Sequence, residues 1–192
     1  MKKIKILSFS IFVISIAVFA NSQSFSKHKG GIYLTYQDYI NHHISYNNSD
    51  KIILNQLLAS SNIKIVENSK IVELKKNEIF GYCDKNNQDF RFYNNELYKI
   101  VINDYLFIYS FYSSSNEEKG KGWIKKQTYY FSITGNSELV PLTVANLKKA
   151  FPNNLKFHDL LDDVKSDEDL CHTDEYTHDI KVNYLLKKSL KN

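Results

Sequence analysis

Apolar and polar residues alternate through the middle of the chain at the two-residue period of β-strands. Four short segments rich in β-branched and aromatic residues follow one another there, at 63–66, 71–74, 79–82 and 90–93. The same pattern continues in three further segments, 97–103, 105–112 and 123–133. Asparagines between them, in 85–88 and 93–96, suit left-handed or Asx-turn conformations. Strands linked so closely pair antiparallel, so the pattern predicts a meander of about six or more strands within residues 60–140.

Near Pro141 the apolar spacing changes to that of amphipathic helices. Thr143 is a suitable N-cap for a first helix, which Pro152 ends. A second helix carries an apolar stripe at i, i+3, i+4 and i+7, formed by Phe157, Leu160, Leu161 and Val164. The segment Tyr176–Leu190 predicts a last helix with Val182, Leu185 and Leu186 inward, and Ser166–Asp169 has a capping-box pattern.

Near the N-terminus, Thr35-Tyr36-Gln37-Asp38 also has the capping-box form and predicts a short helix through about Asn41, followed by a polar loop over 42–50. Strands first and helices last are typical of the α+β class. We therefore predict an antiparallel β-meander sheet followed by C-terminal helices, at 143–190, that pack on one face or end of the sheet.

Residues 1–20 have the layout of a cleavable secretory signal peptide. Lys2, Lys3 and Lys5 precede a mostly apolar run that ends in Val18-Phe19-Ala20. The alternative is an uncleaved anchor, but the run is shorter than the roughly 20 apolar residues that a membrane span needs. We expect an exported protein without a transmembrane anchor, periplasmic, secreted or on the cell surface, with a flexible leader at 21–31 and a single domain at 32–192.

The basic character of the chain belongs largely to this export signal. Removal of its three lysines lowers the formal net charge from +4 to +1, and Arg91 is the only arginine. A strongly basic face is the electrostatic footprint of a nucleic-acid binder, and arginine is the usual residue for planar phosphate recognition. We therefore expect no nucleic-acid partner.

Two cysteines, Cys83 and Cys171, are far apart in the sequence. In an oxidising compartment they can form one disulfide that ties the C-terminal segment to the strands, or they can remain two separate thiols. Spacing alone does not decide between these alternatives, because a bridge requires the two Cβ atoms to come close in space.

Ligand-type side chains crowd together between His158 and Asp179. The candidate metal ligands there are Cys171, His172 and His178, with Asp174 or Glu175 as a fourth. Their donor types suit zinc, but the spacing matches no established zinc motif, and no calcium-loop pattern is present. We favour the interpretation that this segment is an ordinary solvated acidic helix face, opposite the apolar stripe that contains Phe157. We therefore expect no cofactor. The alternative is zinc or calcium bound at this segment.

The chain shows no nucleophile elbow and no glycine-rich phosphate loop, so it identifies no catalytic residue. Aromatic residues make up 14% of the chain. Six tyrosines fall on the predicted strands: Tyr98, Tyr105, Tyr109, Tyr112, Tyr129 and Tyr130. Tyrosines along a sheet face stack on sugars or contact a partner chain, although cross-strand packing in a core is their commoner use.

The stretch Pro141–Asn154, continuing through 156–162, resembles a block found in small uncharacterised exported proteins of Bacteroidota-type bacteria. The segments 31–39 and 79–82 are similar to other parts of those proteins. The resemblance spans most of the chain after residue 20. It implies an exported, single-domain protein and carries no activity, cofactor or catalytic residue with it.

These observations together predict a non-enzymatic domain that binds a protein or glycan partner at the cell envelope, through the tyrosine-rich sheet face or the acidic helical end. The alternative is a metal-dependent hydrolase built on the segment His158–His178, which requires three of its side chains to converge in a pocket. A third possibility is a structural component that pairs through an exposed strand edge.

Overall fold

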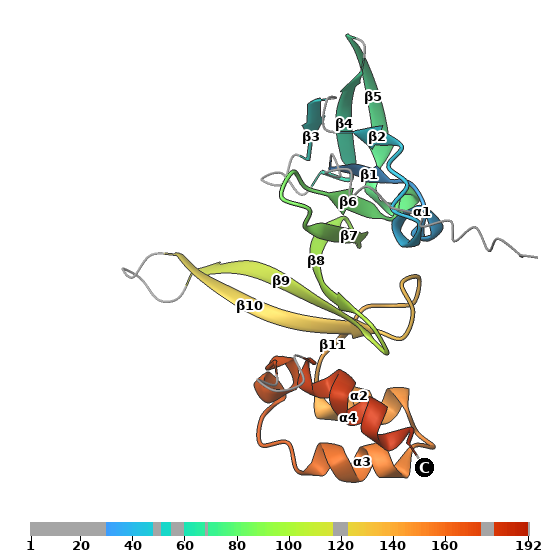
Figure 1. Cartoon of the computed structure of the whole chain (residues 1–192). Helices are drawn as coiled ribbons and strands as arrows, with labels where there is room; N and C mark the ends of the chain where they lie inside the picture. The colour runs from blue at the N-terminus through green and yellow to red at the C-terminus, as the bar shows by residue number, and fades with distance from the viewer. Residues whose placement is uncertain are drawn as a thin grey trace, which may run out of the picture.

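The computed structural model describes residues 30–47, 51–54, 60–67, 69–116, 123–173 and 179–191. These residues form a large and a small antiparallel sheet followed by C-terminal helices (Figure 1), which confirms the predicted α+β class. In this part of the chain, no helix is long and apolar enough to span a membrane. The predicted export segment, 1–20, and most of the predicted leader lie outside the described residues.

The large sheet has the order β11-β10-β9-β8-β7-β6-β1-β2, with antiparallel neighbours throughout. Its strands are β1 (Gly31–Tyr33), β2 (Tyr46–Asn47), β6 (Gly81–Cys83), β7 (Asp89–Tyr93), β8 (Glu96–Asn103), β9 (Phe107–Asn116), β10 (Trp123–Ser132) and β11 (Val140–Pro141). The predicted meander is thus present from β6 to β10. Its asparagine turns are also confirmed, because Asn87, Asn94 and Asn95 all have φ between 49° and 64°.

The alternation predicts a single sheet, but the strands divide into two. β4 (Asn62–Glu67) and β5 (Lys70–Lys75) pair with β3 (Lys51–Ile53) in the separate small sheet. The 3-10 helix η2 (Lys76–Glu78) then redirects the chain into β6. The predicted polar loop at 42–50 contains the short strand β2, and β3 begins directly after it. Tyr105 lies in the turn between β8 and β9 rather than on a strand.

The short helix α1 (Tyr36–Ile40) and the C-terminal helices α2 (Val144–Ala150) and α3 (Leu155–Asp162) occur where predicted, with N-caps Thr35, Thr143 and Asn154. The 3-10 helix η3 (Asp167–Cys171) follows the predicted capping box, since Asp169 accepts from the Ser166 N–H. The last helix, α4, spans Lys181–Ser189. A continuous helix over 176–190 is wrong, because Ile180 is extended and pairs with Thr173.

Three groups of buried side chains hold the described elements together. The helix-side core contains Leu106, Ile108, Phe131, Leu142, Leu147, Phe157, Leu161, Leu170, Ile180, Val182, Leu185 and Leu186. The aromatic core contains Tyr33, Tyr39, Phe80, Cys83, Tyr98, Phe107, Tyr109 and Leu139. The small-sheet core contains Ile32, Ile63, Ile65, Ile79 and Phe92.

Alternation along β9 separates the first two cores. Ile108 belongs to the helix-side core, whereas its neighbours Phe107 and Tyr109 belong to the aromatic core. Successive strand residues point to opposite faces, so the C-terminal helices cover one face of β9 and β10 and the aromatic core lies on the other. Figure 1 shows the helices on one side of the long β9–β10 hairpin and the small sheet at the opposite end of the molecule.

Candidate functional site

The predicted metal-binding segment is described only in part. Cys171 is half-buried at the end of η3, where its thiol donates to the Glu168 carbonyl oxygen at 3.0 Å. His172 is exposed, with Nδ1 3.5 Å from an Asp169 oxygen. No group of three potential ligands occurs among the residues that the structure describes. Asp174, Glu175 and His178 lie outside them, so the two described candidates alone make no site.

The disulfide that the sequence left open is not formed, and both cysteines are free thiols. Cys83 lies on β6 and packs in the aromatic core, whereas Cys171 packs against the helix-side core. The two sulfurs belong to different cores, and a bridge requires neighbouring Cβ atoms. The second alternative, two separate thiols, therefore describes this structure.

Cys83 has the environment of an inert thiol. It is 3% exposed, and burial, followed by the nearby charge of Asp89, raises its pKa to about 12. The thiolate is the reactive form of cysteine, and a raised pKa leaves very little of it at pH 8. We expect Cys83, in a Cys171→Ser variant, to resist Ellman's reagent at pH 8 in the folded protein and to react fully in denaturant. Rapid labelling of the folded variant would contradict this packing.

The six tyrosines do not share one face. Tyr98 and Tyr109 are buried in the aromatic core, where Tyr98 packs edge-on against Tyr130 at 5.2 Å between ring centres. Tyr129 packs on the opposite face, against the helix-side core. Tyr105 and Tyr112 are 43% and 57% exposed. Cross-strand packing is therefore the main use of these residues, and the predicted ligand platform along one face is not present as such.

A cavity of about 480 Å³ lies beside the aromatic core, and sequence inspection did not find it. Its walls come from segments far apart in the chain: Thr35 and Tyr36 at the start of α1, Lys76 on η2, Arg91 and Tyr93 on β7, and Asn136 in the loop between β10 and β11. A cavity of this size is within the range typical of small-ligand pockets. We call it the Arg91 cavity.

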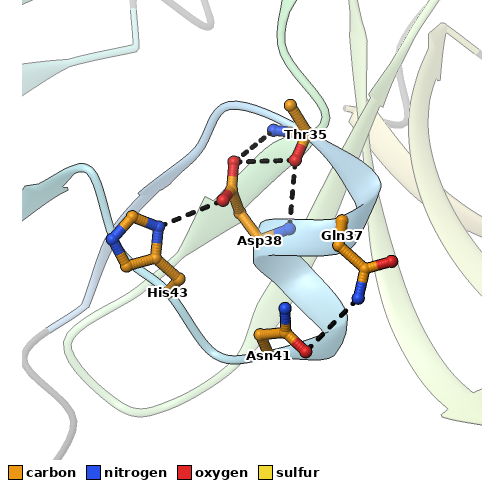
Figure 2. A network of polar contacts seen from close by, with 5 residues as sticks. All are labelled: Thr35, Gln37, Asp38, Asn41 and His43. Carbon is orange, nitrogen blue, oxygen red and sulfur yellow. Dashed lines mark hydrogen bonds and ion pairs between the residues drawn. The ribbon is translucent and has the colours of Figure 1, made fainter.

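The capping box fixes the α1 wall of this cavity, as Figure 2 shows. Thr35 Oγ1 accepts from the Asp38 N–H at 3.0 Å, and the Asp38 carboxylate accepts from the Thr35 N–H at 2.8 Å. His43 adds a further contact to the Asp38 carboxylate, at 3.0 Å. The hydrogen bond from Thr35, followed by that from His43, lowers the pKa of Asp38. The exposed His43 thus supports the capping box at the start of α1, which positions Tyr36, the first residue of this helix.

The Tyr36 ring connects α1 to the rest of the cavity. It lies 5.5 Å from Phe80 and 6.0 Å from Phe107 between ring centres. The ring also contacts Gly135, where a Cβ atom would collide with it. This glycine lets the loop between β10 and β11 approach Tyr36 closely and place the next residue, Asn136, at the cavity.

Arg91 is 6% exposed and lies within an aromatic cage. Its guanidinium carbon is 5.4, 5.7 and 5.8 Å from the ring centres of Tyr93, Tyr109 and Phe80. Its Nη1 donates to the Tyr109 hydroxyl at 3.2 Å. Ser132 Oγ lies 3.0 Å beyond that hydroxyl and itself donates to the Thr134 carbonyl, so Tyr109 donates to Ser132. This chain of hydrogen bonds orients the guanidinium.

Arg91 has no carboxylate within ion-pair distance in the described part of the chain. Asp89 is two residues earlier on the same strand face, and it accepts from the Tyr33 hydroxyl at 3.0 Å instead. Buried charges are normally paired, because desolvation of an isolated ion is costly. An unpaired buried arginine at the wall of a cavity is therefore the most unusual feature of this region.

Lys76 is a second buried cation at the same cavity, and it is 5% exposed. Its ammonium donates to the Asn95 carbonyl at 2.9 Å and forms no ion pair within the described ranges. Burial lowers its pKa, and the charge of Glu96 partly opposes this shift.

One signal in the sequence pointed to this site. In Phe90-Arg91-Phe92-Tyr93, strand alternation puts Arg91 on the same face as an aromatic residue, which is unusual for a solvated charge. The other residues that line the cavity show no local pattern in the sequence, because they are far apart in the chain and only folding brings them together. Comparison of the chain with models of protein families, with characterised proteins and with solved structures finds no match.

Proposed function

We propose that the chain is an exported, non-enzymatic domain that binds a glycan of the cell envelope, with the Arg91 cavity as its binding site. Export rests on the signal-peptide pattern of residues 1–20 and on the resemblance to exported proteins. The observation that supports the binding role most strongly is the cavity itself, at about 480 Å³.

The cavity wall has the side chains that sugar binding requires. Tyr36, Phe80 and Tyr93 supply aromatic faces, on which the apolar face of a sugar ring stacks. Asn77, Asn94 and Asn136 supply amides that both donate and accept hydrogen bonds, as sugar hydroxyls do. A protein partner uses a larger and flatter surface than this cavity, about 800 Å² on each side. The end of a glycan fits it better.

The test is a titration of the ¹⁵N-labelled protein from Asn21 onward with envelope-type oligosaccharides and with peptides, followed by amide chemical shifts. We expect an oligosaccharide to shift the amides of Tyr36, Asn94 and Asn136. Tyr93→Ala should weaken binding about tenfold, the loss expected from one stacked ring. Tyr112→Ala, the matched control on the exposed surface of β9, should leave the affinity unchanged.

Two results would contradict the proposal. If no oligosaccharide shifts the cavity amides, the cavity is not a glycan site. If Tyr112→Ala abolishes binding and Tyr93→Ala does not, the site is the exposed sheet surface instead.

A further inference from the structure

We propose that the glycan bound in the Arg91 cavity is acidic, and that Arg91 together with Lys76 binds its anionic group, a carboxylate or a phosphoryl group. This inference rests on the proposed function and adds the chemical class of the ligand. The charge and burial of the cavity wall carry it.

Most N–H donors of the Arg91 guanidinium are not used by the described protein groups. One of its nitrogens donates to Tyr109, and no other hydrogen bond of this side chain is formed within the described residues. In that same part of the chain, every side-chain nitrogen or oxygen shielded from solvent has a hydrogen-bond partner. The remaining guanidinium nitrogens therefore reach solvent, and Arg91 lines the cavity. They are free to bind a ligand there.

The aromatic cage makes Arg91 suitable for binding an anion. Three rings within 5.8 Å of the guanidinium carbon hold the side chain in place and provide a low-dielectric surrounding. A planar guanidinium binds a carboxylate or a phosphoryl group through two parallel hydrogen bonds, which are stronger than neutral ones. Little side-chain entropy is lost on binding, because the arginine is already ordered.

The other charges at the cavity do not cancel this positive field. Lys76 adds a second buried cation, which forms no ion pair with any residue that the structure describes. The carboxylate of Glu78, which also lines the cavity, lies 2.7 Å from the exposed ammonium of Lys75 and is neutralised by it. Asp89 is not among the residues that line the cavity, and its carboxylate accepts from the Tyr33 hydroxyl. The charged side chains that line the cavity are thus two cations, Arg91 and Lys76, and one anion, Glu78, so an anionic ligand supplies the missing counter-charge.

Isothermal titration calorimetry with four probes tests this inference: glucose, glucuronate, glucose 6-phosphate and inorganic phosphate. We expect glucuronate or glucose 6-phosphate to bind at least tenfold more tightly than glucose. Which of the two binds identifies the anionic group. Inorganic phosphate alone should bind more weakly than glucose 6-phosphate, because the stacking rings then have no partner.

Variants then connect this preference to the two cations. Arg91→Met and Lys76→Met should each reduce the preference for the acidic sugar at least tenfold, while Lys188→Met, an exposed lysine on α4, should not. Thermal unfolding shows whether Arg91→Met, which disturbs the aromatic cage, still folds. If Arg91→Met does not fold, the Lys76→Met variant and the comparison of the four probes on the unaltered protein test the acidic class of the ligand.

The outcomes separate the two proposals. Equal binding of glucose and glucuronate, with shifts at the cavity amides, would overturn the acidic class and leave the glycan function standing. Binding of inorganic phosphate as tightly as glucose 6-phosphate would overturn the sugar assignment. Shifts caused only by a peptide with a free C-terminal carboxylate, and by no sugar, would overturn both.

Discussion

Replacing Phe157 with alanine is expected to lower the free energy of unfolding by about 3–5 kcal/mol. Phe157 is fully buried on α3 and lies edge-on against Phe151, at 5.5 Å between ring centres. It belongs to the helix-side core, which joins the C-terminal helices to β9 and β10. Truncation removes the transfer free energy of the ring and leaves a cavity between layers that cannot close completely. Chemical denaturation followed by circular dichroism measures the loss.

The same helix provides a matched control. Leu155 is 69% exposed, and Leu155→Ala should change the free energy of unfolding by no more than about 0.5 kcal/mol. Most domains of this kind are stable by about 5–15 kcal/mol, so the loss at Phe157 is large enough to unfold part of the population near physiological temperature. Equal effects of the two variants would mean that α3 does not pack on the sheet through the Phe157 side.

The helical half of the fold was predictable because its signals are local. The spacing of Phe157 and Leu161 specified one helix face, and the hydroxyl of Thr143 specified where the preceding helix begins. Both follow from interactions within one or two turns. The last helix was misplaced because apolar spacing alone does not reveal the extended bridge between Thr173 and Ile180, which delays its start.

In the strand-rich half, alternation predicted the positions of the strands but not how they pair. Alternation identified the strands and their turns, but the partner of a strand depends on contacts distant in sequence. Ile63 and Ile65 pack against Ile32 and Phe92 in the small-sheet core, and nothing near β4 in the sequence specifies those partners. The division into two sheets therefore became visible only in the folded chain.

The candidate site was the least predictable part. The density of ligand-type side chains drew attention to Cys171 and His172, whose described neighbourhood brings no third ligand to them. Arg91 was noted only because it is the single arginine. Its importance comes from burial without an ion-pair partner among the residues described, and its burial depends on Tyr109 and Phe80, which other strands and loops place around it.

Replacing Asn183 with alanine is the second change from which we expect a large effect, a loss of about 2–4 kcal/mol of unfolding free energy. Asn183 is 1% exposed on α4. Its side chain accepts from the Leu106 N–H at 2.9 Å and donates to the Leu106 carbonyl at 3.2 Å. The amide thus acts as a strand partner for the turn between β8 and β9. Alanine leaves the buried Leu106 N–H without a partner and leaves the carbonyl only the long hydrogen bond from the Asp104 N–H, at 3.4 Å.

An exposed asparagine gives the control, since Asn153→Ala should cost no more than about 0.5 kcal/mol. Asn183→Asp distinguishes the two hydrogen bonds. A buried carboxylate facing the Leu106 carbonyl has a raised pKa in the folded state, so this variant should lose stability as pH rises through that pKa and regain it as pH falls and the acid can donate. Urea denaturation at pH 4.5 and 7.5 measures the difference relative to the unaltered protein. A loss of less than about 1 kcal/mol for Asn183→Ala at both pH values would mean that water satisfies Leu106, and that α4 docks through its apolar residues alone.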